Sequence, residues 1–152
     1  MADLKNDPRI DPRIKAMMGA IPVRIQGDVA SREQLLEEAS SPEAIAAWER
    51  GAALMGLLDN ETVAPSAGLQ VTTHEFVSAP DGNTVKIQFI RPVSPVPVPC
   101  VYYIHGGGMQ IMSCFDGIYR AWGRIIAAQG VAVAMVDFRN CLVPSSAPEV
   151  AP

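Results

Sequence analysis

Residues 100–108 are Cys-Val-Tyr-Tyr-Ile-His-Gly-Gly-Gly, an apolar run followed by a histidine and three glycines. An uninterrupted apolar run of this length predicts a strand that is buried on both faces. Residues 116–129 follow with apolar side chains at helical spacing, which predicts a helix that Asp116 caps and Gly130 ends. Residues 131–136 are a second apolar run. The order strand, helix, strand predicts a βαβ unit with parallel strands and a right-handed crossover.

The segment before this unit has the pattern of a hairpin. Residues 69–77 and 84–90 are rich in β-forming residues and flank a Pro-Asp-Gly-Asn turn, so we expect them to pair antiparallel. Apolar and polar residues alternate in the second run, which predicts one covered face and one wetter face. Residues 92–99 contain four prolines, and because each removes a backbone donor, this stretch predicts a stiff connector.

The first sixty residues are predicted to form helices. Asp-Pro pairs at 7–8 and 11–12 each offer an N-cap and a first helical residue, and we place one short helix over residues 12–18. Ser31 and Ser41 are further predicted helix starts. The helix after Ser41 carries Ile45, Trp48, Ala52 and Met55 on one face, which we interpret as a packing face. We therefore expect a helical segment over residues 1–60 and an α/β core over residues 61–152.

Composition excludes several classes of protein. The chain has 152 residues, and its 12 Lys and Arg against 16 Asp and Glu give a net charge of −4, without a basic run that would suit nucleic acid. No apolar run approaches the ~18 residues of a membrane helix, and the first residues do not have the pattern of a secretory signal. Three widely spaced cysteines indicate free thiols rather than a disulfide framework. We expect a globular, cytoplasmic protein.

The residues between the first buried strand and its helix are the best candidates for chemistry. In the stretch from His105 to Met109, three consecutive glycines leave successive backbone amides unshielded, which favours binding of an anion at the end of a parallel strand. A phosphate site is disfavoured, because neither G-x-G-x-x-G nor Gly-Lys-Ser/Thr is present. An oxyanion hole for acyl transfer and a simple tight turn both remain possible interpretations.

The sequence around these glycines resembles a known family. Residues 104–109 resemble the HGGG loop of the hormone-sensitive-lipase family of α/β-hydrolase esterases. Residues 133–140 resemble the next strand of that family, which usually ends in Asp-Tyr-Arg. The two motifs together look most like the brefeldin A esterase branch, and the order of all predicted elements agrees along essentially the whole chain. The resemblance implies an α/β-hydrolase fold with N-terminal cap helices.

The resemblance also implies roles for individual residues. Gly107 and Gly108 match the glycines whose amides form the oxyanion hole, and Gly106 supports the turn. His105 matches a histidine that orients the loop and is not the catalytic base. Asp137 and Arg139 match a structural pair. The implied substrate is a small-molecule ester, and no metal or organic cofactor is implied.

The rest of the catalytic machinery of the family has no match in these residues. G-x-S-x-G does not occur, and the only histidines are His74 and His105. Since the triad of this fold runs Ser, Asp or Glu, then His, no nucleophile, acid or base is identified. We therefore expect the N-terminal half of an esterase-like protein, without activity as a 152-residue chain.

Several alternatives remain at this stage. The same scaffold serves as a non-catalytic small-molecule receptor in plant gibberellin receptors, and an inactive truncated product is a third possibility. Ser113 and Cys114 follow the glycines but have no sequence-adjacent base, and Cys114 is interpreted as a packed thiol. His74 is interpreted as a strand-surface histidine. We expect Ile45, Trp48 and Met55 to face the catalytic domain or acyl pocket, whereas acyl and alcohol specificity and oligomeric state are not predicted.

Overall fold

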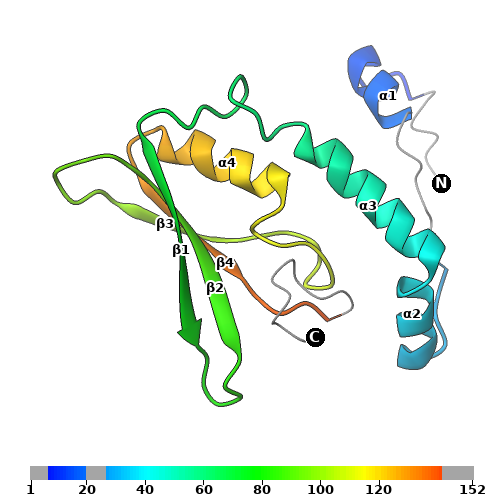
Figure 1. Ribbon diagram of the computed structural model, residues 1–152. Coiled ribbons are helices and arrows are strands. Elements are labelled where there is room, and N and C mark those ends of the chain that lie inside the picture. The colour runs from blue at the N-terminus through cyan, green and yellow to red at the C-terminus, as the bar shows by residue number, and fades with distance from the viewer. Residues whose placement is uncertain (1–6, 20–26, 142–152) are drawn as a thin grey trace. The chain divides into compact units, whose positions relative to one another are not determined.

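The structure, a computed structural model, describes residues 7–19 and 27–141 (Figure 1). The chain divides into two units, residues 1–31 and residues 32–152. The helix of the first unit, α1 (Pro12–Gly19), begins at the predicted residue. It starts there because the Asp11 carboxylate accepts the backbone N–H of Arg13 at 2.8 Å and Pro12 lacks the N–H that would be unpaired.

The second unit begins with two helices, α2 (Arg32–Ala39) and α3 (Pro42–Gly56). The predicted start of α3 is confirmed, since the Ser41 hydroxyl accepts the N–H of Ala44 at 3.2 Å. Neither helix contains a fully buried residue. Among the described residues, no helix has the length and apolar character needed to cross a membrane.

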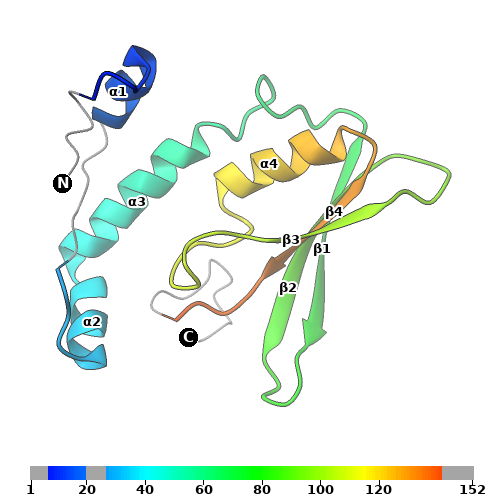
Figure 2. The ribbon, with the colours of Figure 1, turned by 180° about the vertical axis from the view of Figure 1, so that it is seen from behind.

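Four strands form one mixed sheet in the order β1-β2-β4-β3 (Figures 1 and 2). Their bounds are Leu69–Val77 for β1, Thr84–Pro92 for β2, Cys100–Ile104 for β3 and Ala132–Asp137 for β4. The predicted antiparallel hairpin is confirmed in β1 and β2. The predicted parallel pair is confirmed in β3 and β4, with α4 (Gly117–Ala127) between them in the chain. The fold class is therefore α/β, as predicted.

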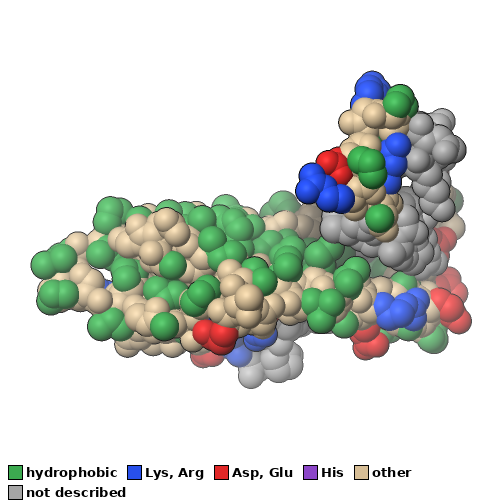
Figure 3. All heavy atoms as spheres, turned by 90° about the horizontal axis from the view of Figure 1, so that it is seen from above, with side chains coloured by type: hydrophobic (Ala, Val, Ile, Leu, Met, Phe, Trp, Pro, Cys, Tyr) green, Lys and Arg blue, Asp and Glu red, His purple; other side chains and the backbone are tan. Residues whose placement is uncertain are grey.

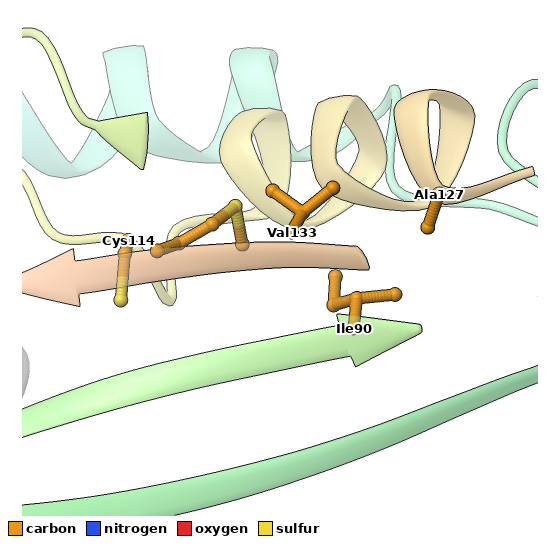
Figure 4. Close-up of a cluster of buried hydrophobic side chains, with 5 residues drawn as sticks. Ile90, Cys114, Ala127 and Val133 are labelled. Carbon is orange, nitrogen blue, oxygen red and sulfur yellow. The ribbon is translucent and has the colours of Figure 1, made fainter. Parts of the chain in front are cut away.

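Helix α4 covers one face of the sheet and closes a small apolar core (Figure 4). Ile90 comes from β2, Val133 and Met135 from β4 and Ala127 from α4, and each is at most 1% exposed. The close approach depends on Gly123, where an added Cβ would lie 2.8 Å from the ends of the Ile90 and Met135 side chains. This core fixes β4, and therefore the positions of the residues that follow it.

The covered face of β2 carries both polar and apolar side chains. Gln88 lies opposite Met135 in the register and Ile90 lies opposite Val133, so these two residues point toward α4 and are buried. The alternating residues Ile87 and Phe89 occupy the other face and are only half-buried. The alternation is present, but its polar member is the buried one, because α4 lies on the side that the polar residues share.

The prediction that residues 100–104 are buried on both faces is wrong for the described part of the chain. β3 is an edge strand of the sheet, and Tyr102 and Ile104 are 60% and 61% exposed. Both side chains lie on the face opposite α4, hereafter the open face. By register, the open face carries a set of apolar side chains from four strands: Phe76, Val85, Ile87, Phe89, Ala134, Tyr102 and Ile104.

Exposed apolar side chains are numerous elsewhere in the described residues as well. Figure 3 shows hydrophobic side chains gathered on the left of the surface seen from above, with few charged side chains among them there. An apolar sheet face beside an unpaired strand edge is a surface that promotes association.

We expect Tyr102→Lys together with Ile104→Lys to reduce self-association of the 152-residue chain. Two charges on the open face disfavour contact between copies of that face. The matched control is Val93→Lys together with Val96→Lys, which adds the same charge at exposed positions outside the sheet. Sedimentation velocity should show a smaller associated fraction for the first pair only, and an equal effect of the two pairs would contradict this role of the open face.

Candidate functional site

The glycine loop, residues 105–109, leaves the carboxyl end of β3 beside the carboxyl end of β4. The strands are parallel and Ile104 pairs with Val136, so the residues after both strands meet at one edge of the sheet. This edge is where open α/β sheets bind ligands.

The backbone of the loop requires glycine at one position in particular. Gly107 has a φ of 109°, and a Cβ there would lie 2.1 Å from the carbonyl oxygen of Ile111. Gly108 has a φ of 63°, but a Cβ there would meet nothing within 4 Å. Gly107 is therefore required by both its conformation and its contact with Ile111, and Gly108 is required by its conformation alone.

The carbonyl oxygen of Gly107 fixes the direction of the neighbouring amide. It accepts the N–H of Gln110 at 3.1 Å and the N–H of Ile111 at 3.3 Å, which closes the loop on itself. Because a trans peptide group is planar, the N–H of Gly108 points away from those two donors. No described residue accepts the N–H of Gly107 or of Gly108. Two neighbouring backbone donors are thus available to a ligand.

His105 is a packed part of the loop. It is 4% exposed, and its ring stacks on Phe138 with a centroid distance of 4.1 Å and an interplanar angle of 7°. Nδ1 lies 2.7 Å from the Gly106 carbonyl oxygen and donates to it, since a carbonyl only accepts. Nε2 is buried and has no partner among the described residues. This geometry suits a residue that orients the loop.

Asp137, which ends β4, and the four residues after it hold the glycine loop and the residues that follow the loop, and we call residues 137–141 the clamp segment. Phe138 stacks on the His105 ring, and Asp137 Oδ1 accepts the Ser113 hydroxyl at 2.6 Å. Nδ2 of Asn140 donates to the Met112 carbonyl at 2.7 Å. The N–H of Cys141 donates to the Met109 carbonyl at 2.9 Å. The parallel pairing of β3 with β4 therefore brings the clamp segment into contact with the glycine loop and with the residues that follow the loop.

Two residues that the clamp segment binds are not glycines yet have left-handed backbones. Met109 has a φ of 62° and Met112 a φ of 78°. Each such conformation costs a residue with a Cβ about 1–2 kcal/mol. The loop is thus kept in a conformation that its own sequence disfavours, and the clamp segment supplies compensating bonds.

An apolar cavity of about 210 Å³ lies between α3 and the residues that follow the glycine loop. Its lining residues are Trp48, Gly51, Ala52 and Met55 from α3, Ile111, Met112 and Asp116 from the residues between the glycine loop and α4, and Ile118 from α4. Trp48 and Met55 face this cavity, in agreement with the sequence pattern. Ile45 is 46% exposed and does not line it, contrary to the prediction.

The position of α3 beside the cavity depends on close contacts with α4. Gly56 and Gly117 pack so tightly that a Cβ on Gly117 would lie 2.9 Å from the Gly56 Cα. Asp59, just after α3, forms ion pairs with Arg120 and Arg124 of α4, the latter at 2.7 Å. The wall of the cavity is therefore a fixed part of the unit.

Asp116 has a different role from the one predicted. It precedes α4, but its side chain forms no hydrogen bond with the first turn of the helix. Instead the carboxylate accepts the N–H of Ser113 at 2.9 Å, because the loop turns back over it. Desolvation raises the pKa of Asp116 above its usual value. It is the only ionisable residue among those that line the cavity.

Other residues considered in the sequence lie in ordinary surroundings. Asp137 and Arg139 have separate partners, since Asp137 binds Ser113 and Arg139 pairs with Asp81 at 2.5 Å. His74 is exposed on β1, contacts Thr72 at 3.0 Å and packs edge-on against a phenylalanine. In the described ranges, no group of three or more His, Cys, Asp or Glu is placed to hold a metal ion.

Neither Ser113 nor Cys114 is placed as a nucleophile. The Ser113 hydroxyl is buried, donates to Asp137 and accepts the N–H of Phe115 at 3.1 Å. Cys114 is fully buried, and this desolvation raises the pKa of its thiol to about 12. A thiol of that kind carries almost no thiolate near neutral pH.

Sequence reasoning missed the contributions of Asn140, Met109 and Met112. Asn140 lies in the motif of residues 133–140, but that resemblance assigned it no role, and a left-handed methionine has no sequence signal. Ala52 was identified only as part of a packing face, and Gly51 was not singled out. Their cavity depends on how α3 meets a loop more than fifty residues away.

We expect iodoacetamide at pH 8 to alkylate Cys100 and Cys141, which are exposed, and to leave Cys114 unmodified in the folded chain. The physical reason is that alkylation requires an accessible thiolate. Peptide mass spectrometry measures the three sites separately, and denaturation in urea serves as the control in which all three react. Labelling of Cys114 at the rate of Cys100 in the folded chain would contradict its assignment as a packed thiol.

Several esterases are similar to this chain in sequence and structure. No family model matches the chain. The structure of esterase Est22 is 60% identical, has a TM-score of 0.90, and is matched over 97% of this chain and 43% of its own. Brefeldin A esterase, described as a bacterial homologue of human hormone-sensitive lipase, is 25% identical with a TM-score of 0.67 over 97% of this chain and 40% of its own.

Two further comparisons agree. A bacterial heroin esterase is 26% identical with a TM-score of 0.62, over 88% of this chain and 37% of its own. Gut esterase 1 of Caenorhabditis elegans is 32% identical over 65 residues, which are 43% of this chain and 12% of that protein. The chain thus spans about two-fifths of the length of the esterases whose structures it matches. It is related to esterases of the α/β-hydrolase fold, including the hormone-sensitive-lipase type, as its sequence motifs indicated.

Proposed function

We propose that this chain is part of a serine carboxylic-ester hydrolase and that its glycine loop forms the oxyanion hole. The observation that carries the proposal is the pair of unpartnered backbone donors at Gly107 and Gly108, beside the carboxyl ends of two parallel strands. The relationship to esterases supports an ester as the substrate.

The chemistry follows from where charge develops. When a serine hydroxyl attacks an ester carbonyl, the carbonyl oxygen becomes negatively charged, and donors already in place stabilise it without reorganising. Removing one such donor typically lowers kcat by ~100-fold or more. Gly107 and Gly108 supply the N–H groups in this proposal. Gly106 contributes to the turn, and His105 orients it through its bond to Gly106 and its stack on Phe138.

The nucleophile, acid and base of the proposed enzyme lie outside these 152 residues. No G-x-S-x-G is present, and neither histidine suits a general base. His105 is buried with Nδ1 committed to the loop, and His74 lies on an exposed strand. In the complete protein, a serine and a histidine would therefore approach the loop from other segments.

The apolar cavity is proposed to receive the acyl group of the ester. Seven of its eight lining residues lack an ionisable side chain, and two of them, Ile111 and Met112, closely follow the glycine loop that would hold the carbonyl oxygen. Residues 1–60 would then act as a cap, with α3 as the wall. A net charge of −4 without a basic run does not suit a nucleic-acid substrate, and three free cysteines fit a reducing cytoplasm.

We expect the complete protein to hydrolyse p-nitrophenyl butyrate and to be inactivated by diethyl p-nitrophenyl phosphate. Mass spectrometry should place the phosphoryl group on a serine outside residues 1–152, because a phosphorylating inhibitor marks the activated nucleophile. The 152-residue chain alone serves as the control and should show no turnover above buffer. Turnover by this chain, a phosphoryl group on Ser113, or binding of esters by the complete protein without turnover would contradict the proposal.

We expect Ala52→Leu in the complete protein to lower kcat/KM for p-nitrophenyl octanoate by ~10-fold or more relative to the acetate. A larger side chain fills the cavity, and each methylene that an apolar pocket excludes changes discrimination by roughly tenfold or more. The matched control is Ala53→Leu, an exposed neighbour on the same helix that does not line the cavity. A similar change in both variants, or none in Ala52→Leu, would dismiss the cavity as the acyl site.

A further inference from the structure

The two left-handed methionines share a feature beyond their backbone angle. The carbonyl of Met109 accepts the N–H of Cys141 at 2.9 Å, and the carbonyl of Met112 accepts Nδ2 of Asn140 at 2.7 Å. Both residues with positive φ and a Cβ are therefore tied to adjacent residues of the clamp segment. Of the two bonds, the one from Asn140 is made by a side chain.

Asn140 is placed to hold this bond rigidly. It is 2% exposed and lies three residues beyond the end of β4, whose buried core residues Val133 and Met135 fix the strand. Its amide donates to Met112 over a sequence separation of 28 residues. A buried donor with a single described acceptor fixes where that carbonyl lies.

The hydrogen bond between Asn140 and Met112 affects the direction of the Gly108 N–H through a short series of bonds. Met112 adjoins Ile111, whose N–H donates to the Gly107 carbonyl. That carbonyl and the N–H of Gly108 belong to one planar peptide group, so rotation of one moves the other. A backbone shift at Met112 therefore changes the direction of the Gly108 N–H.

We propose that Asn140 is a positioning residue for the oxyanion donors, which it aligns by holding Met112 in its left-handed conformation. The proposal rests on the proposed function, because the donors matter only if a developing oxyanion occupies the site. Asn140 itself does not contact the reacting atoms in this account. Its contribution appears in the transition state more than in the binding of substrate.

The first test compares Asn140→Ala with Arg139→Ala in the complete protein. Arg139 is the exposed neighbour on the clamp segment, and its side chain pairs with Asp81 away from the loop. We expect Asn140→Ala to lower kcat for p-nitrophenyl butyrate by ~10-fold or more, with KM changed by less than about threefold, because misplaced donors act on the transition state. Equal kcat in the two variants would overturn the proposal.

The second test is rescue through the backbone. Glycine adopts a positive φ without strain, so in a Met112→Gly background the loss of Asn140 should matter less. We expect the ratio of kcat between Met112→Gly and Met112→Gly/Asn140→Ala to be several-fold smaller than the ratio between wild type and Asn140→Ala. Equal ratios would show that Asn140 acts independently of Met112, which overturns the mechanism.

A third measurement does not depend on activity and covers the case in which the variant folds poorly. Amide hydrogen exchange of residues 106–113 should be faster in Asn140→Ala than in Arg139→Ala, whereas exchange in β4 should be the same. Faster exchange everywhere would indicate a general loss of stability and overturn the positioning role. An inactive wild-type protein with the expected exchange pattern would instead contradict the proposed function alone.

Discussion

The peptide group between Gly107 and Gly108 is the constraint on which the site depends. Its carbonyl is held inside the loop by two backbone donors, so its N–H is directed outward, where no described residue accepts it. The rest of the unit serves this orientation, because the core under α4 fixes β4 and the clamp segment after β4 holds the loop. A flexible turn alone would not hold these donors in a fixed direction. Here the loop is held by residues at the end of β4, which is the most buried strand of the sheet.

The sequence predicted the parts of this arrangement that local patterns determine. The hairpin, the parallel pair and the helix starts at Pro12 and Pro42 follow from turn residues, apolar runs and capping residues, and the structure confirms them. The glycine loop was also predicted, because three consecutive glycines after an apolar run have few structural explanations. The resemblance to the hormone-sensitive-lipase family added the expectation of an α/β-hydrolase fold and an oxyanion hole. The relationship to esterases agrees with that resemblance.

Most of the failures concern contacts between distant segments, whereas that of Asp116 concerns a local hydrogen bond with Ser113. Residues 100–104 are apolar enough for a central strand, yet in the described chain they form an edge, because burial depends on neighbours that periodicity does not reveal. Gln88 is buried and Phe89 is not, because α4 packs on the polar side of β2. Asp116 has the sequence of a helix cap, but the loop offers it the N–H of Ser113 instead. Asn140 ends the motif of residues 133–140, but the sequence did not indicate its hydrogen bond, because the acceptor lies 28 residues earlier.

The most direct test is a crystal structure of the complete protein after reaction with diethyl p-nitrophenyl phosphate. The phosphoryl group mimics the tetrahedral intermediate, and its free oxygen takes the position of the oxyanion. We expect this oxygen to lie about 3 Å from the nitrogens of both Gly107 and Gly108, with the Met112 carbonyl still bound by Asn140. A phosphoryl oxygen that is held by other donors, with both glycine amides turned away from it, would show that Gly107 and Gly108 do not form the oxyanion hole.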